Sequence, residues 1–261
     1  VALRPDDNEA RFDLARIRPL EGFSENLPAA RTEIKSLAND PALRERALAL
    51  LLVDALNQKN GNDVVDFADQ LAVNPSISVS DQLLIVEAYR RFAPDRQAAT
   101  LARLEAKFAD SPENASALAS YLVASEQSAE MNRWAATLPE ASRNADGVQI
   151  NNAFAFLQQK RWDDLETYLK SCKWKETEFL RHALLAYKHR ALGNERLFSD
   201  EWHLAVIELG NNVRKLQLLL NRVNLWNWPD ERYELLWKHF SIDPSDASLR
   251  QQLIAWESSK G

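Results

Sequence analysis

The sequence predicts an all-α chain, built as a stack of about seven helical hairpins that ends in a C-terminal capping helix. Apolar residues recur at steps of three and four along most of the 261 residues, which is the period of one helix face. Glycine occurs only six times, which suits helices better than strands and turns. A small residue followed by an aromatic one recurs at 88–89, 120–121, 153–154 and 186–187, so the aromatic residue returns after 32, 33 and 33 residues.

Capping and helix-breaking residues delimit the first two pairs. Asp6 or Asp7 can cap a helix over about 8–18, which Pro19 and Gly22 end. Further helices are expected at about 24–38, 44–58 and 64–73, with a turn at 60–62 and with prolines closing the pairs at 41 and 75. These two prolines are 34 residues apart, which indicates the length of one repeat.

Serine and proline mark the next pairs. Ser80 can cap a helix, Pro94 can open its partner because the first helical turn tolerates proline, and Pro112 ends that partner. The remaining pairs are expected at about 113–124 with 128–138, at 147–159 with 162–172, within the stretch 177–211, and at 212–226 with 230–240. Ser245 or Asp246 can cap the last helix, which reaches about residue 258.

The stretch 177–211 shows the hairpin pattern most clearly. Its two amphipathic runs meet at Gly193, where a left-handed residue is least costly at a helix end. The stretch resembles the tetratricopeptide repeat family, a helix–turn–helix unit of about 34 residues. The resemblance rests on Ala186 in the first helix, Gly193 at the turn and Ala205 in the second helix, while the family's closing proline is absent here. It implies a right-handed superhelical α-solenoid.

The resemblance also implies a concave groove lined by residues of the first helices, which would hold a peptide or protein partner. The positions expected to line this groove are Ile85, Tyr89, Tyr121, Ile150, Asn151, Phe154, Ala183, Tyr187 and Arg190. An aromatic stripe of this kind suits a binding surface because it offers large, rigid contact area. Ordinary packing between repeats is the alternative explanation for the same stripe.

Tryptophan is concentrated in the second part of the chain, where seven of the eight residues follow position 160. The segment 226–229, with the sequence WNWP, stands at an expected turn. One of its rings could be exposed for a carbohydrate or a proline-rich peptide. The alternative is that the large rings fill spaces between the C-terminal hairpins.

The sequence lacks the features of several other classes of protein. The net charge of −6 speaks against a nucleic-acid binder. No phosphate-binding loop, dinucleotide fingerprint or nucleophile elbow is present. His182 and His189 have no partner motif beyond Glu178, so no metal is expected, and no cofactor either. We therefore expect a non-catalytic protein–protein interaction scaffold, not an enzyme.

The domain prediction is a single repeat domain over 1–261, with a possible loose joint at 139–146. Because residues 1–7 resemble the end of a repeat, we expect the chain to be a segment of a longer protein. The alternative function is then a helical accessory domain of an enzyme or membrane-anchored protein. No apolar run is long enough for membrane insertion, and the single Cys172 favours a reducing compartment such as the cytoplasm. The sequence is also compatible with a membrane anchor or a targeting signal ahead of Val1.

Overall fold

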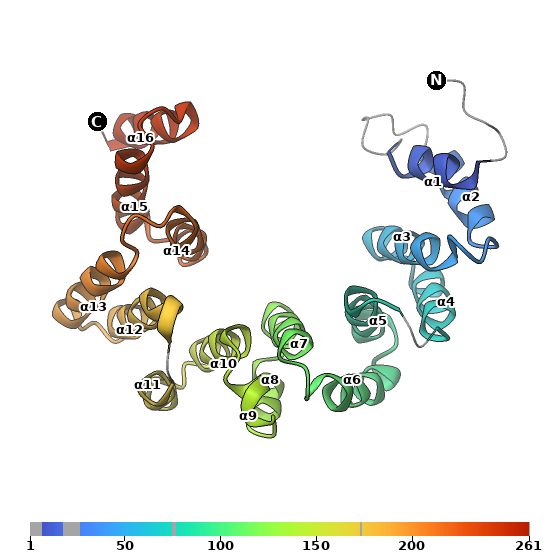
Figure 1. Ribbon diagram of the computed structural model, residues 1–261, viewed down its shortest axis with the longest axis horizontal. Helices are drawn as coiled ribbons and strands as arrows, with labels where there is room; N and C mark the ends of the chain where they lie inside the picture. The colour runs from blue at the N-terminus through green and yellow to red at the C-terminus, as the bar shows by residue number, and fades with distance from the viewer. Residues whose placement is uncertain (1–6, 18–26, 75–76, 173, 261) are drawn as a thin grey trace. The chain divides into compact units, whose positions relative to one another are not determined.

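The chain is all-α in a computed structural model that describes residues 7–17, 27–74, 77–172 and 174–260. Over these residues it contains helices and turns and no strand (Figure 1). It divides into two compact units, residues 1–121 and 122–261, which are described separately. The expected repeat tail at 1–6, the helix end at Pro19 and Gly22, the helix start near 24 and the closing proline at 75 lie outside the described residues.

Unit 1 consists of helix pairs in sequence order. The helices are α1 (Asn8–Ile17), α2 (Leu27–Leu37), α3 (Arg44–Gln58), α4 (Gly61–Ala72), α5 (Val79–Phe92) and α6 (Pro94–Phe108). Each of α1, α3 and α5 packs on the helix that follows it, and α2 and α4 also pack on the next pair. The apolar core runs through these contacts and is lined by residues such as Leu52, Val64 and Leu71. Helix α7 (Pro112–Ala124) crosses the boundary between the units.

Unit 2 repeats this arrangement. Its helices are α8 (Ser128–Ala135), α9 (Glu140–Arg143), α10 (Asp146–Gln158), α11 (Trp162–Ser171), η3 (Lys175–Thr177), α12 (Glu178–Ala191), α13 (Glu195–Glu208), α14 (Val213–Leu225), α15 (Pro229–Ile242) and α16 (Ala247–Lys260). Helices α12 and α13 form the most extensive pair, as the clear pattern at 177–211 predicts. The last helix, α16, packs on α15 through Leu249 and Leu253, so the predicted final helix is confirmed.

The same turn closes the first helix of five hairpins. A residue with positive φ stands at positions 59, 126, 160, 193 and 227. At each of these turns the next backbone N–H donates to the carbonyl oxygen five residues earlier, as in Asn194 to His189 at 2.8 Å. This is the Schellman arrangement, which satisfies carbonyl groups at a helix end. Ala93, 34 residues after Lys59, interrupts the series because Pro94 starts α6 directly. The turns thus show a period of 33–34 residues.

The structure confirms some expected caps and corrects others. Oδ1 of Asp7 accepts the N–H of Ala10, and Oδ1 of Asp246 accepts those of Ser248 and Leu249. The prediction for Ser80 was wrong, because Ser78 caps α5 by accepting the N–H of Asp81. Both serines precede an apolar helical run, so the sequence pattern alone did not distinguish them.

One further prediction at a helix end was wrong. Gly61 was expected inside a turn at 60–62, yet it is the first residue of α4. A Cβ atom there would lie 3.0 Å from Cδ1 of Phe92, so the glycine allows α4 to pack closely on α5. The helix that Pro112 was expected to end, α6, does stop before it, at Phe108. Pro112 is also the first residue of α7, where its missing N–H costs nothing.

The predictions that concern the whole chain stay predictions. These are the right-handed superhelix, the single domain over 1–261 and the loose joint at 139–146. Within that segment, residues 140–143 form the short helix α9.

Candidate functional site

Three of the predicted groove residues lie in unit 1, and two of them belong to its core. Ile85 is 2% exposed and Tyr89 is 5% exposed. The Tyr89 hydroxyl donates to Oδ1 of Asp69 on α4 at 2.7 Å, so this ring faces the second helix of the preceding pair. Burial and the Asp69 carboxylate raise the pKa of Tyr89 to about 12. Tyr121 is half-buried, and its hydroxyl donates to Oε2 of Glu87 at 3.2 Å.

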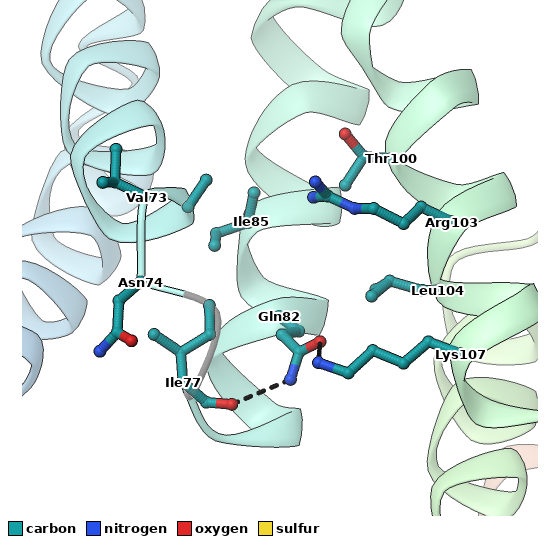
Figure 2. A pocket seen from close by; sticks show the side chains of 10 residues that line it. Val73, Asn74, Ile77, Gln82, Ile85, Thr100, Arg103, Leu104 and Lys107 are labelled. Atoms are coloured by element: carbon teal, nitrogen blue, oxygen red, sulfur yellow. Dashed lines mark hydrogen bonds between the residues drawn. The ribbon is translucent and has the colours of Figure 1, made fainter.

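Ile85 also lines a cavity of about 250 Å³ that Figure 2 shows beside α4, α5 and α6. The Gln82 amide closes one end of it: its Nε2 donates to the Ile77 carbonyl oxygen at 2.9 Å, and its Oε1 accepts from Nζ of Lys107 at 2.8 Å. The polar groups of Gln82 are therefore already satisfied within the protein. With Arg103 as a further cation, the cavity could accept an apolar group that carries a negative charge.

Six predicted groove residues lie in unit 2, on the first helices of two successive hairpins. Phe154 on α10 and Ala183 on α12 are buried. The half-buried ones are Ile150, Asn151, Tyr187 and Arg190. The structure brings Ile150, Phe154 and Tyr187 into one apolar cluster. Asn151 turns back on its own helix, where its Nδ2 donates to the Gly147 carbonyl oxygen at 2.7 Å.

Two residues that the prediction did not include complete this cluster. The ring of Trp226, at the end of α14, lies 5.1 Å from the ring of Tyr187 and 6.5 Å from that of Phe154, measured between centroids. The guanidinium carbon of Arg222, one turn earlier on α14, lies 4.1 Å from the centroid of the Phe154 ring. We call Ile150, Phe154, Tyr187, Arg222 and Trp226 the aromatic–arginine surface. All of them except Phe154 are half-buried, so part of each side chain meets solvent.

The two arginines of this region differ in their electrostatic environment. Arg190 lies over the rings of Phe198 and Trp228, 3.6 and 4.4 Å from their centroids, and it pairs with the buried carboxylate of Glu231. Arg222 has no ion pair or hydrogen bond from its side chain to any described residue, and burial lowers its pKa. Arg222 is thus a partly desolvated cation whose positive charge no carboxylate of the described chain neutralises.

The sequence contained a signal for these residues. Trp226 belongs to the WNWP segment, and Arg222 precedes it by four residues, which places both on one face of α14. The proposed exposed ring of that segment is Trp226, since Trp228 is 7% exposed and packs against Phe198 and Trp202. What periodicity could not show is that this face of α14 meets Phe154 of α10.

Two further groups of polar side chains in unit 2 are satisfied by contacts within the protein. Nδ1 of His182 lies 2.6 Å from a carboxylate oxygen of Glu201, and its Nε2 lies 3.6 Å from one of Glu178. Glu166 pairs with Lys170 and Lys188. In the part of the chain that the structure describes, no three His, Cys, Asp or Glu side chains gather as metal ligands would. None of the described helices combines the length and apolar character needed to cross a membrane.

Comparisons with known proteins add two structures of similar backbone. No family model and no curated protein matches the chain. The chain is similar to a structure titled "MamA MSR-1 C2", with 17% identity and a TM-score of 0.40 over 64% of this chain and 97% of the other. It is also similar to a structure titled "Crystal structure of APC/C hetero-tetramer Cut9-Hcn1", with 12% identity and a TM-score of 0.36. That match covers 98% of this chain and 58% of the other chain. The tetratricopeptide-like all-α fold is shown by the chain's own helix pairs.

Proposed function

We propose that the chain is a non-catalytic protein-interaction scaffold and that the aromatic–arginine surface of unit 2 binds an extended segment of a partner protein. The helical-hairpin fold supports a scaffold role in general terms, because stacked first helices present a continuous row of side chains. The predicted groove residues Ile150, Phe154 and Tyr187 contribute to this surface, and Arg222 and Trp226 extend it.

The observation that carries the proposal is the state of Arg222. A guanidinium that is partly removed from water and has no anionic partner is in an unfavourable state. A carboxylate from a partner would neutralise it and could accept two parallel N–H bonds from the planar guanidinium. The segment that fits is therefore acidic at one position, through an Asp or Glu side chain or a chain-terminal carboxylate.

The aromatic rings define what should flank that carboxylate. Tyr187 and Trp226 are half-buried, and their ring centroids lie 5.1 Å apart at an interplanar angle of 60°. Tyr187 also stacks on the buried ring of Trp228, so both partly exposed rings are held in place by packing. Rigid rings lose little conformational entropy on binding and favour apolar or proline side chains as contacts. We infer that the ligand is a short peptide motif that combines a carboxylate with one or two apolar residues. We expect no nucleic acid as a ligand.

The experiment is a binding screen of the 261-residue chain against a library of acidic and neutral peptides, read by fluorescence polarisation. For a selected peptide, Arg222→Gln should weaken binding at least tenfold, which corresponds to about 1.4 kcal/mol. Arg214→Gln is the matched control, because Arg214 is an exposed arginine on the same helix. The same loss should follow when the acidic residue of the peptide becomes its amide.

The proposal fails if peptide binding is insensitive to Arg222→Gln, or if the screen selects neutral and acidic peptides equally. Binding that needs the predicted residues of unit 1 instead, Tyr121 among them, would move the interaction to that unit. The absence of any peptide ligand would favour the alternative role, that of a helical accessory domain for parts outside this segment.

A further inference from the structure

The cavity of Figure 2 belongs to unit 1 and takes no part in the aromatic–arginine surface. It lies between the end of α4, the first half of α5 and one face of α6. Its volume is about 250 Å³, slightly below the range of about 300–1,000 Å³ that drug-sized ligands occupy, so it suits a smaller molecule.

Three buried apolar side chains line this cavity. They are Ile77, which precedes α5, Ile85 on α5 and Leu104 on α6, and we call them the apolar wall. Val73, directly after α4, also lines the cavity and is 82% exposed, so its side chain stands at the mouth. A ligand that covers Val73 would remove apolar surface from water, which stabilises the complex.

Two cations of α6 lie beside the apolar wall. Arg103, Leu104 and Lys107 are spaced at helical steps, so they share one face of α6. Figure 2 shows both cationic side chains reaching from α6 toward α5. Nζ of Lys107 donates to Oε1 of Gln82 at 2.8 Å. The Arg103 side chain makes no hydrogen bond or ion pair with any described residue, so its guanidinium is available to a ligand.

Among the described residues, no carboxylate lines the cavity, although the chain has 38 acidic and 32 basic residues. Glu105 of α6 lies on another face of that helix. Glu45 of α3 reaches only the edge of the cavity, where its Oε2 accepts from Nδ2 of Asn74 at 3.2 Å. Arg103 and Lys107 are four residues apart on one helix and repel each other, and an anion between them would turn this repulsion into attraction.

We propose that this cavity binds a free aliphatic monocarboxylate. The carboxylate would bind Arg103 and Lys107, since a planar guanidinium can donate two parallel N–H bonds to it. The acyl chain, of roughly eight carbon atoms in view of the cavity's size, would lie along the apolar wall. This inference goes beyond the function proposed for the aromatic–arginine surface and does not depend on it, because the two sites share no residue and lie in different units.

The test is a titration of the 261-residue chain with octanoate, followed by NMR of the isoleucine and leucine methyl groups. We expect saturable binding with a Kd of about 1 mM or tighter, with shifts of the methyl signals of Ile77, Ile85 and Leu104. Butanoate should bind at least about tenfold more weakly, because each buried methylene group contributes a factor of about four. Octylamine, which has the same chain length and the opposite charge, should also bind at least about tenfold more weakly.

Variants connect binding to the two cations. Arg103→Gln should weaken octanoate binding at least about tenfold, whereas Arg103→Lys should keep most of the affinity because it keeps the charge. Val73→Asp should also weaken binding, because it places a negative charge at the mouth without removing a buried contact. Arg44→Gln is the matched control, an exposed arginine of unit 1 that does not line the cavity, and it should bind normally. Retained helicity and thermal unfolding of each variant would show that it folds.

Three results would overturn the inference. One is the absence of saturable methyl shifts with octanoate up to about ten times the expected Kd. Another is octanoate binding that Arg103→Gln and Val73→Asp leave unchanged, which would place the ligand elsewhere. The third is equal binding of octanoate and octylamine, which would show that the cations do not select the carboxylate.

Discussion

The guanidinium of Arg222 lies 4.1 Å from the centre of the Phe154 ring, and no described carboxylate accompanies it. The contact joins α14 to α10, two first helices that are separated in the chain by a complete hairpin. A cation over an aromatic face is stabilised by the ring quadrupole, but by less than the cost of full desolvation. Arg222 is thus held in place by an aromatic partner and remains available to an anion.

We expect Arg222→Met to leave the free energy of unfolding unchanged or to raise it by up to about 1 kcal/mol, because methionine keeps apolar contact while the unneutralised charge is removed. The partial exposure of Arg222 limits the gain. Urea denaturation at neutral pH measures the difference. Arg190→Met is the contrasting variant: it leaves the buried Glu231 carboxylate unpaired and should cost about 2 kcal/mol or more. Equal losses in both variants would contradict this account of Arg222.

Acid should weaken the pairing of Glu166. Hydrogen bonds from Lys170 and Lys188 lower the pKa of Glu166 to about 2 from its ordinary 4.5. Because the folded pKa is the lower one, this stabilisation is present above pH 4.5 and is lost as the pH falls toward 2. Glu166→Gln should therefore cost about 1 kcal/mol at pH 7, a value reduced by solvent screening, and the cost should vanish near pH 2. Denaturation curves at pH 7, 4.5 and 2.5 test this.

Asp164→Asn is the control for that experiment, since Asp164 lies on the same helix as Glu166 and pairs with Arg161, the residue before that helix, and both side chains of the pair are exposed. Its cost should be smaller at every pH, because an exposed pair of this kind contributes at most a few tenths of a kcal/mol. The interpretation fails if the two variants show the same pH dependence.

Tyr89→Phe should destabilise the chain by about 1–2 kcal/mol through loss of the 2.7 Å hydrogen bond to Asp69. The loss stays in this range because Arg96 continues to bind both oxygens of that carboxylate. Chemical denaturation gives the change, with Tyr121→Phe as a comparison of smaller expected effect, as its hydroxyl contact is longer at 3.2 Å and half-buried. A larger loss at Tyr121 would show that the Tyr89 bond contributes little.

The repeated turn predicts opposite effects of glycine at equivalent positions. Gly193 has φ of 73°, so Gly193→Ala should cost about 1 kcal/mol even though its Cβ would meet no atom within 4 Å. Lys59 and Lys160 occupy the same turn position with φ of 57° and 56°. Lys160→Gly should raise stability by up to about 1 kcal/mol through relief of left-handed strain. Thermal unfolding distinguishes the two signs, and a destabilised Lys160→Gly would contradict the explanation.

Most of the helices could be predicted from the sequence, because each depends on local periodicity and on short-range caps. The range 44–58 agrees with α3 at both ends, and the pattern at 177–211 corresponds to α12 and α13. The errors occurred where the local sequence allows two structural roles, such as two possible capping residues or a glycine that suits either a turn or a close helix contact. Ser78 and Ser80 are both possible caps, and Gly61 serves helix packing against Phe92 instead of a turn. Neither choice can be made before the neighbouring helix is placed.

The candidate site was only partly predictable. Phe154 and Tyr187 were identified from their recurrence, and Trp226 from its unusual segment, but nothing in the sequence connected them. The contact of Arg222 with Phe154 depends on the angle and spacing of helices 68 positions apart in the chain. Likewise, periodicity placed Tyr89 on a helix face without showing that Asp69 of α4 covers it.

The sequence by itself determined the helices, their pairing into hairpins and the approximate repeat length, because hydrogen bonds and apolar faces within a hairpin are local. Only the tertiary structure decided which polar side chains find partners. Arg190 meets Glu231, whereas Arg222 and Arg103 meet no carboxylate of the described chain. The physical reason is that desolvation and charge pairing depend on distances between helices that are remote in the sequence, and these distances are set by packing.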